Sequence, residues 1–462
     1  TVTVGGDIYL ITNSGNGSVN MGTLAITGSV DLATGTGAAT VIDTSGDLDF
    51  AASEVGGDLA ATSSNGSITD SGVLDIGGNA DFTAADGKKI YLDEVSGYAG
   101  TLDFNAGSGT LHEVWIDNND DLTNAVSLQA TTLTGNLTVR ANGRIIQTGA
   151  LDIGGTSDFI VTSSDAEYVV LTNTSNDFTG AVSMTNTSKG QVITTGELVI
   201  GTIQGTWATF ESAGAVTQSA AGTFDLSNFF SVDARSADDS VFYDVTLTNA
   251  GSETTRIKDI YAKNFTYLET DAIIISTNDV TETFTLTAGG AITDWDEGML
   301  AASGSMDAVI TARSSDGTTY YDITLDDVDG NFQSASVIGK IVELVDAGAI
   351  ILGDSTVTET YEVTATASGD ITDSGVLDIT GNATFTAAAG QQVILDSNNT
   401  FAGTVTFDTP SGSLKNVTIT DTTELDLTAL TLAQVSSAGG DLIVTAGGAL
   451  TDTGPLIIPG TT

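Results

Sequence analysis

The nonapeptide ITDSGVLDI occupies Ile68–Ile76 and returns unchanged at Ile371–Ile379. Two close relatives of it, IIQTGALDI and LTDTGPLII, occupy Ile145–Ile153 and Leu450–Ile458. In each of them a short apolar segment is followed by a Ser-Gly or Thr-Gly turn signal, and then by a second short apolar segment. The motif therefore predicts two short β-strands joined by a tight turn, and its return predicts a repeat protein.

Two weaker copies of the motif fill the gap in the middle of the chain. They read VTQSAAGTFDL at Val216–Leu226 and ITDWDEGML at Ile292–Leu300. With them, the six copies follow one another at intervals of 71 to 79 residues, which indicates a long period of about 77 residues. Within one period, similar segments begin at Asp58, Ala80 and Thr101, so a shorter unit of about 19–22 residues also recurs.

A unit of this length is typical of one coil in a parallel β-helix. We therefore predict an all-β fold, a right-handed parallel β-helix (β-solenoid), running as one continuous solenoid over residues 1–462 with about 23 coils. Val, Ile, Leu and Phe are expected to point inward and to stack between coils, while Thr, Ser and Asp face water. A meander of hairpins is the competing all-β arrangement, and the scarcity of Asn-Gly and Asp-Gly pairs disfavours it.

The composition restricts the partners that this protein can have. Asp and Glu number 60 against 12 Lys and Arg, which gives a formal net charge of -48. Nucleic acids and anionic membrane surfaces would be repelled, so cations or cationic surfaces are the expected partners. The chain has no cysteine, which excludes disulfides and thiolate chemistry. No apolar stretch is long enough for membrane insertion.

The two ends of the sequence read as parts of the same repeat. The first residues, TVTVGGDIYL, already have the pattern of strands and lack the basic and apolar regions of a signal peptide. We expect the chain to be a mature or excised segment of a longer exported protein. Without polar caps, its apolar ends predict end-to-end self-association or continuation of the same chain.

Three longer phrases carry a family resemblance. They are GGDLIVTAGGALTDTG (Gly439–Gly454), SGDITDSGVLDITGNATFTAAAG (Ser368–Gly390) and NDFTGAVSMTNTS (Asn176–Ser188). These phrases resemble the repeat regions of filamentous-haemagglutinin-type exoproteins and similar giant bacterial surface proteins. The resemblance implies right-handed parallel β-helices, export to the cell exterior, and a role in attachment or assembly. The secretion domain found at the amino terminus of that family is missing from this sequence.

Catalysis on a β-helix needs carboxylates clustered with a basic residue, or a pair of acids that flank a sugar bond. The basic residues are scattered, although Arg140 and Arg144 could meet Asp117, Asp120 and Asp121 across coils. The single histidine, His112, has no His or Cys companion and fits a turn better than a metal site or catalytic triad. The sequence therefore predicts that the protein is not an enzyme.

Calcium is the one cofactor that the residues suggest, because it takes oxygen ligands at turns. Three acidic segments qualify: DNNDD at 117–121, DWDE at 294–297 and DDVDG at 326–330. None matches a known calcium loop, and ordinary solvated turns also use Asp and Asn. The candidate ligands are Asp117, Asp120, Asp121, Asp294, Asp296, Asp326, Asp327 and Asp329.

The sequence as a whole favours an extracellular structural or adhesive repeat protein, which forms a stiff rod, stalk or filament at the cell surface. Cell-surface glycans are further expected partners. The alternative is a polysaccharide-active or polysaccharide-binding β-helix protein. Convergence of acidic and basic side chains in one groove would favour an enzyme, and dispersed charges would favour the fibre.

Overall fold

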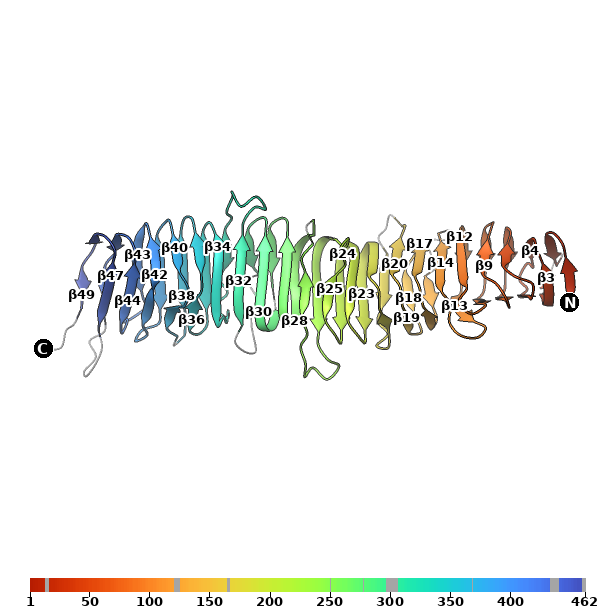
Figure 1. The fold of residues 1–462 in the computed structure, drawn as a ribbon, viewed down its shortest axis with the longest axis horizontal. Coiled ribbons are helices and arrows are strands. Elements are labelled where there is room, and N and C mark those ends of the chain that lie inside the picture. Colours follow the sequence, from red (N-terminus) through yellow and green to blue (C-terminus); the bar gives the residue numbers. More distant parts are fainter. Residues whose placement is uncertain are drawn as a thin grey trace. The chain divides into compact units, whose positions relative to one another are not determined.

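The computed structural model describes residues 1–12, 16–119, 125–163, 167–249, 251–276, 278–295, 306–367, 369–432 and 440–458. In these ranges the chain forms strands, turns and irregular segments without any helix, and accordingly no helix there could cross a membrane. Two compact units are present, Thr1–Ser227 and Asn228–Thr462. In both, short strands stack side by side along the unit (Figure 1).

The strands of the first unit are β1 (Val2–Val4), β2 (Ile8–Ile11), β3 (Val19–Ile26), β4 (Ser29–Ala33), β5 (Ala39–Asp43), β6 (Leu48–Phe50), β7 (Ser53–Val55), β8 (Leu59–Ser63), β9 (Ile68–Asp70), β10 (Leu74–Ile76), β11 (Ala80–Ala84), β12 (Lys89–Tyr98), β13 (Thr101–Ala106), β14 (Glu113–Asn118), β15 (Val126–Leu128), β16 (Thr131–Leu133), β17 (Leu137–Ala141), β18 (Ile145–Gln147), β19 (Leu151–Ile153), β20 (Ser157–Val161), β21 (Tyr168–Leu171), β22 (Asp177–Phe178), β23 (Val182–Thr194), β24 (Leu198–Ser212) and β25 (Val216–Gln218).

The strands that follow are β26 (Phe224–Ala234), β27 (Val245–Leu247), β28 (Glu253–Glu269), β29 (Ile273–Ile275), β30 (Asn278–Ala288), β31 (Ile292–Asp294), β32 (Asp307–Ala312), β33 (Ile323–Leu325), β34 (Ser334–Gly339), β35 (Val342–Asp346), β36 (Ile350–Leu352), β37 (Ser355–Val357), β38 (Tyr361–Ala365), β39 (Ile371–Asp373), β40 (Leu377–Ile379), β41 (Ala383–Ala387), β42 (Val393–Phe401), β43 (Thr404–Asp408), β44 (Val417–Asp421), β45 (Leu425–Leu427), β46 (Leu430–Thr431), β47 (Leu442–Ala446), β48 (Leu450–Asp452) and β49 (Leu456–Ile457).

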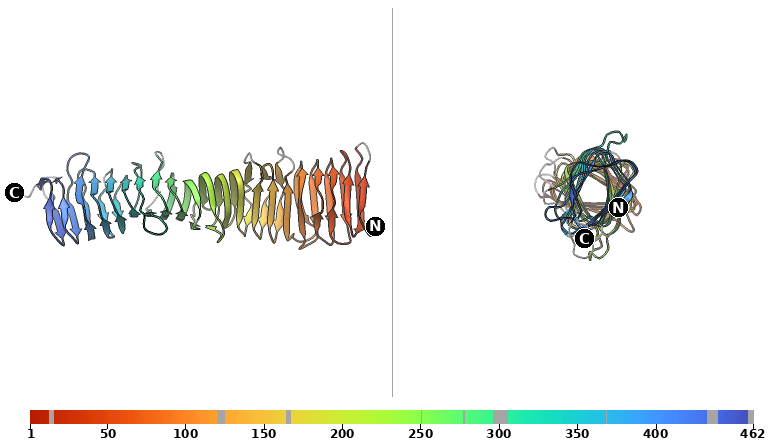
Figure 2. Two further views of the ribbon diagram at one scale, coloured as in Figure 1. Left: turned by 90° about the horizontal axis from the view of Figure 1, so that it is seen from above. Right: turned by 90° about the vertical axis from the view of Figure 1, so that its left-hand side faces the viewer.

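Parallel pairing between successive coils confirms the predicted β-solenoid. Leu59 in β8 pairs with Ala80 in β11, and Ala80 pairs with Leu102 in β13, so the chain returns to the same face of the unit once per coil. A view turned by 90° shows strands stacked in the same way on another side of each unit (Figure 2). The right-handed sense of winding and the continuity of one solenoid over the whole chain remain predictions.

The coils vary in length more than the repeat suggests. One of the shorter coils runs from Leu198 to its partner Val216. A much longer coil separates Ile292 from its partner Ile323. The two units together contain about 19 turns, fewer than the number expected from the sequence, because several corners carry insertions.

The interior is built from columns of apolar side chains, as predicted. The strands alternate buried and outward residues, as in β11, where Ala80, Phe82 and Ala84 are buried. Phe82 stacks on Phe104 of the next coil, with ring centroids 6.1 Å apart. Such contacts bury large rings between neighbouring coils, which is the main favourable term in the stability of a solenoid.

The prediction that Asp and Ser face water is wrong at the inner corners. Ser96, Asn118, Asn399 and Asp421 are almost fully buried. Ser96 Oγ accepts a hydrogen bond from the backbone N–H of Leu74 (3.0 Å), one coil earlier. In the identical copy of the motif, Asn399 Oδ1 accepts the equivalent bond from the backbone N–H of Leu377. A backbone donor that leaves the ladder at a corner needs an acceptor, and an inward polar side chain provides it.

Candidate functional site

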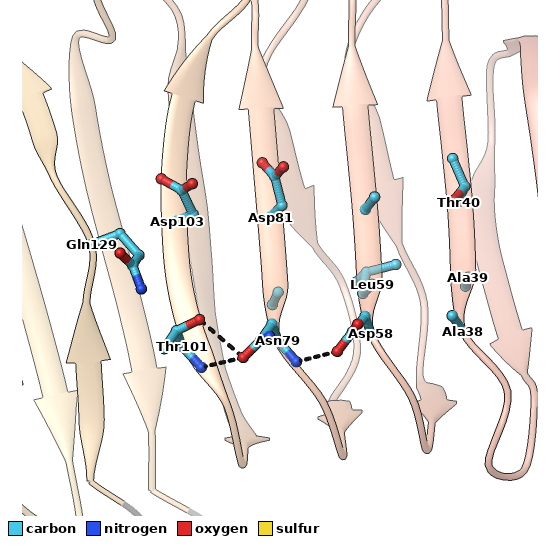
Figure 3. Close-up of a pocket in the computed structure, with 12 residues that line it drawn as sticks. Ala38, Ala39, Thr40, Asp58, Leu59, Asn79, Asp81, Thr101, Asp103 and Gln129 are labelled. Atoms are coloured by element: carbon cyan, nitrogen blue, oxygen red, sulfur yellow. Dashed lines mark hydrogen bonds between the residues drawn. The ribbon is translucent and has the colours of Figure 1, made fainter. Parts of the chain in front are cut away.

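A hollow of about 300 Å³ lies in the first unit, over the starts of β5, β8, β11 and β13 (Figure 3). Ala38 and Ala60, on the outer face of the coils, contribute small side chains to its lining. Asp81 and Asp103 stand in register on the neighbouring strands β11 and β13. Their carboxylates point to the same side (Figure 3), so the hollow carries a pair of acids on adjacent coils.

A ladder of polar side chains forms the edge of this hollow. Asp58 Oδ1 accepts a hydrogen bond from the backbone N–H of Asn79 (2.8 Å). Asn79 Oδ1 in turn accepts two bonds from Thr101, one from its backbone N–H (3.0 Å) and one from its hydroxyl (2.9 Å). Each side chain therefore closes the turn of the next coil.

Glycine is required at the turn next to this ladder. A Cβ on Gly78 would lie 2.4 Å from Asp58 Oδ1 and 2.6 Å from the backbone carbon of Gly57. Gly100, one coil further on, approaches Gly78 in the same way, with a Cβ at 2.5 Å from its carbonyl oxygen. The coils can stack this closely only because neither position has a side chain.

The Asp81–Asp103 pair has no basic side chain beside it in the hollow. None of the twelve residues that line the hollow is Lys, Arg or His. Asp81 Oδ1 accepts hydrogen bonds from Asn105 Nδ2 (3.3 Å) and from Thr83 Oγ1 (3.4 Å), both on the strand surface. Asp81 is exposed and Asp103 is half-buried, and carboxylates placed in this way can attract a cation or hydrogen-bond a sugar.

The same corner recurs in the second unit with a different surface. There Asn382 Oδ1 accepts hydrogen bonds from the backbone N–H (3.1 Å) and hydroxyl (3.0 Å) of Thr404, beside a hollow of about 520 Å³. Thr384 and Thr406 pair in register at the places of Asp81 and Asp103. The ladder is thus common to both copies while the acid pair is not, which assigns the ladder to the fold.

The first calcium candidate forms an ion pair. Asp117 is almost fully buried, and its Oδ2 lies 3.0 Å from Arg140 Nη1. Burial raises the pKa of Asp117, and Arg140 opposes that rise. Arg144 pairs with another carboxylate, that of Glu167, whose Oε2 lies 3.9 Å from the arginine Nε. The other candidates of this segment, Asp120 and Asp121, lie outside the described residues.

The second and third calcium candidates meet on neighbouring coils. Asp294 Oδ2 accepts a hydrogen bond from the backbone N–H of Asp327 (3.1 Å). Burial, with the nearby carboxylate of Asp326, raises the pKa of Asp294 to about 6. Asp329 donates its backbone N–H to Asp327 Oδ1 (3.0 Å), an ordinary turn contact. Asp296 lies outside the described residues.

No group of three or more His, Asp or Glu side chains is placed to hold a metal ion in the described part of the chain. Calcium binding therefore stays a prediction. His112, also considered from the sequence, is exposed, and its Nδ1 lies 3.4 Å from the hydroxyl of Thr134.

A buried acidic group inside the first unit was missed by the reasoning from sequence. Asp70, in the motif ITDSGVLDI, is only 8% exposed, and its Oδ2 has no hydrogen-bond partner among the described residues. Burial raises the pKa of Asp70 to about 7, although the backbone N–H groups of Asp93 and Glu94 oppose the rise. Tyr98, fully buried nearby, also has its pKa raised, first by burial and then by Asp70. Only the alternation within the motif could have indicated that this Asp points inward.

Comparison with known families supports the repeat. A family described as "Repeats of unknown function (DUF5649)" matches residues 36–101, 117–185, 262–339, 339–408 and 414–462. Each match contains one copy of the motif, and the weak copy at Val216–Leu226 falls in the part between the second and third matches. No curated protein and no solved structure matches the chain significantly. Because the five matches cover well over half of the sequence, the chain belongs to this family of repeats of unknown function.

Proposed function

We propose that this repeat protein is an extracellular structural or adhesive protein, in which each β-solenoid unit acts as a stiff spacer at the cell surface. The observation that carries the proposal is how the polar side chains are used. Asp58, Asn79 and Asn382 hold the turns of neighbouring coils, and Ser96 and Asn399 hold the inner corners. A surface whose acids and amides lock one coil to the next favours rigidity over turnover.

The resemblance of the repeats to filamentous-haemagglutinin-type exoproteins supports a location outside the cell. The absence of cysteine and the net charge of -48 are compatible with a stable, soluble exterior protein. The partners that we propose are a further molecule or segment of the same solenoid at the ends, cationic surfaces, and glycans. We also propose that calcium binds at the acidic turns. We propose neither nucleic-acid binding nor membrane insertion.

Labelling of intact source cells tests the location. Antibodies raised against the purified chain should bind cells that have not been permeabilised, and protease added to intact cells should remove the signal. Labelling that requires permeabilisation would contradict the proposal.

A polysaccharide-active or polysaccharide-binding protein is the second candidate, and the paired Asp81 and Asp103 beside the hollow favour it. Incubation of the purified chain with neutral and acidic polysaccharides separates the two functions. We expect no new reducing ends and no unsaturated products. Thr384→Ala is the matched control, because Thr384 stands at the equivalent position of the second unit. The protein would be an enzyme if products formed, disappeared in Asp81→Asn and were retained in Thr384→Ala.

A further inference from the structure

Two surface hairpins in the second unit are related by the long period. Their sequences are ARSADDSVFYDVTL at 234–247 and ARSSDGTTYYDITL at 312–325, and eight of the fourteen positions are identical. The two segments lie one long period apart in the sequence. The hairpins therefore descend from one repeated element, and their differences can be compared position by position.

The backbone of the two hairpins is the same. Arg235 forms an antiparallel bridge with Phe242, and Arg313 forms one with Tyr320. In the first tip, Ser236 Oγ donates to Asp238 Oδ1 at 2.7 Å. In the second tip, the corresponding serine donates to Asp316 Oδ1, also at 2.7 Å. The scaffold that presents the two arginines is thus matched.

The fold does not need these hairpins. The strong copies of the motif close the same corner with the short segments AADGKKI (84–90) and AAAGQQV (387–393). The second hairpin occupies the longer stretch 312–323 between the equivalent strands. A loop that is longer than its coil requires, and is fixed by its own hydrogen bonds, is a common place for a binding function on a rigid scaffold.

In the first hairpin the arginine has its own carboxylates. Arg235 Nε and Nη2 donate to the two oxygens of Asp233, at 2.7 and 2.6 Å. Nη1 lies 3.4 Å from Asp239. The guanidinium also lies over the ring of Tyr261, with Cζ 4.1 Å from its centroid. The guanidinium of Arg235 is therefore paired with side chains of its own unit.

The second hairpin has lost each of these partners. Thr311 stands at the position of Asp233, Gly317 at that of Asp239, and Ile338 at that of Tyr261. Arg313 forms no ion pair with any residue that the structure describes. The ring of Tyr320 remains behind it, 5.9 Å from Cζ to centroid. A Cβ on Gly317 would lie 3.9 Å from both Cζ and Nε of Arg313, so a side chain at this position would contact the guanidinium.

We propose that Arg313 binds a carboxylate group from a ligand, which takes the place that Asp233 occupies in the first hairpin. The bidentate contact of Arg235 shows the geometry of the bound state, because guanidinium and carboxylate match in two parallel hydrogen bonds. The chain's net charge of -48 repels polyanions. The ligand class is therefore a molecule with a single carboxylate on a neutral body, such as an acidic sugar residue. This inference does not depend on where the protein is located.

Arginine side-chain NMR of the full chain tests the proposal, because the sequence has only five arginines. With ¹⁵N-arginine labelling, D-galacturonate should shift the Nε–Hε signal of Arg313 in a saturable way. A single charge-assisted pair supports a dissociation constant on the order of 1 mM. D-galactose, which lacks the carboxylate, should leave the signal in place. The variant Arg313→Gln assigns the signal, and Arg235 provides the internal control.

Two substitutions restore the partners found in the first hairpin. Thr311→Asp and Gly317→Asp should each weaken galacturonate binding at least tenfold, because an internal carboxylate then occupies the guanidinium. Retained affinity in both variants would overturn the proposal, as would equal shifts of all five arginine signals. A shift of the Arg313 signal with protein concentration alone would assign the carboxylate to a second molecule of the chain and would also overturn the proposed ligand.

Discussion

Replacing Asp70 with Asn tests whether the interior of the first unit holds a carboxyl group that resists ionisation. Asp70 is 8% exposed, its Oδ2 has no hydrogen-bond partner in the part of the chain that the structure describes, and its pKa is raised from 3.8 to about 7 by burial. The folded state therefore binds this proton more tightly than the unfolded state. Its contribution to stability is complete below about pH 4 and is lost as the pH rises through about 7.

The size of this loss follows from the shift. A difference of about 3 pKa units corresponds to about 4 kcal/mol at most, at 1.36 kcal/mol per unit. Asn resembles the neutral acid, so Asp70→Asn should melt close to the wild type at pH 4. At pH 8 it should melt higher, by up to roughly 10 °C for a unit of this size.

Thermal unfolding of the full chain, followed by circular dichroism between pH 4 and pH 8, measures this difference. Asp373→Asn is the matched control, because Asp373 occupies the same place in the repeated motif and its Oδ2 accepts a hydrogen bond from Asn399 Nδ2 (2.7 Å). A smaller stabilisation at pH 8 is expected there, since this bond favours the charged carboxylate. An Asp70→Asn variant whose melting curve follows the wild type at every pH would refute the reasoning.

Three further changes give distinct results. Gly78→Ala should destabilise the first unit by about 1–3 kcal/mol, because the new Cβ would meet Asp58 Oδ1 at 2.4 Å. The control Gly46→Ala should have little effect, because a Cβ there would meet nothing within 4 Å. Equal denaturant midpoints for the two variants would exclude close stacking of the coils. Phe385→Ala should lower the free energy of unfolding by about 3–5 kcal/mol, because this ring packs against three other aromatic rings of the second unit. A decrease below about 1 kcal/mol in urea unfolding would argue against a packed aromatic column. Removal of calcium with a chelator should lower the melting temperature if the acidic turns bind the ion, and an unchanged curve would dispose of calcium as a structural element.

The sequence predicted the repeated strands well because their pattern is local. The motif at Ile68–Ile76 became β9 and β10, its identical copy became β39 and β40, and the Ile and Leu residues of all four strands are buried as expected. The spacing of Asp58, Ala80 and Thr101 predicted the register, since Leu59, Ala80 and Leu102 do pair in succession. Apolar periodicity and turn residues are enough to place such elements.

The inner corners and the hairpins could not be predicted in the same way. Ser96 and Asn399 look like solvent-facing residues in the sequence, and only the path of the backbone shows that an N–H of the previous coil needs them. The pairing of Arg235 with Asp233, and its loss at Arg313, depends on loop geometry that spacing does not specify. The acidic turns remained ambiguous because Asp serves turns, ladders and ion binding alike.

Parallel winding of the coils is the claim on which the fold and the proposed function both depend, and the absence of cysteine allows a direct measurement. In parallel register, Asp81 faces Asp103 and Thr83 faces Asn105, at a strand spacing of about 4.8 Å that a disulfide can bridge. Double-cysteine variants of these two pairs should both oxidise rapidly, while the diagonal pairs 81 with 105 and 83 with 103 should not. Rapid oxidation of the diagonal pairs, with none at the direct pairs, would mean that β11 and β13 run in opposite directions and would contradict the solenoid.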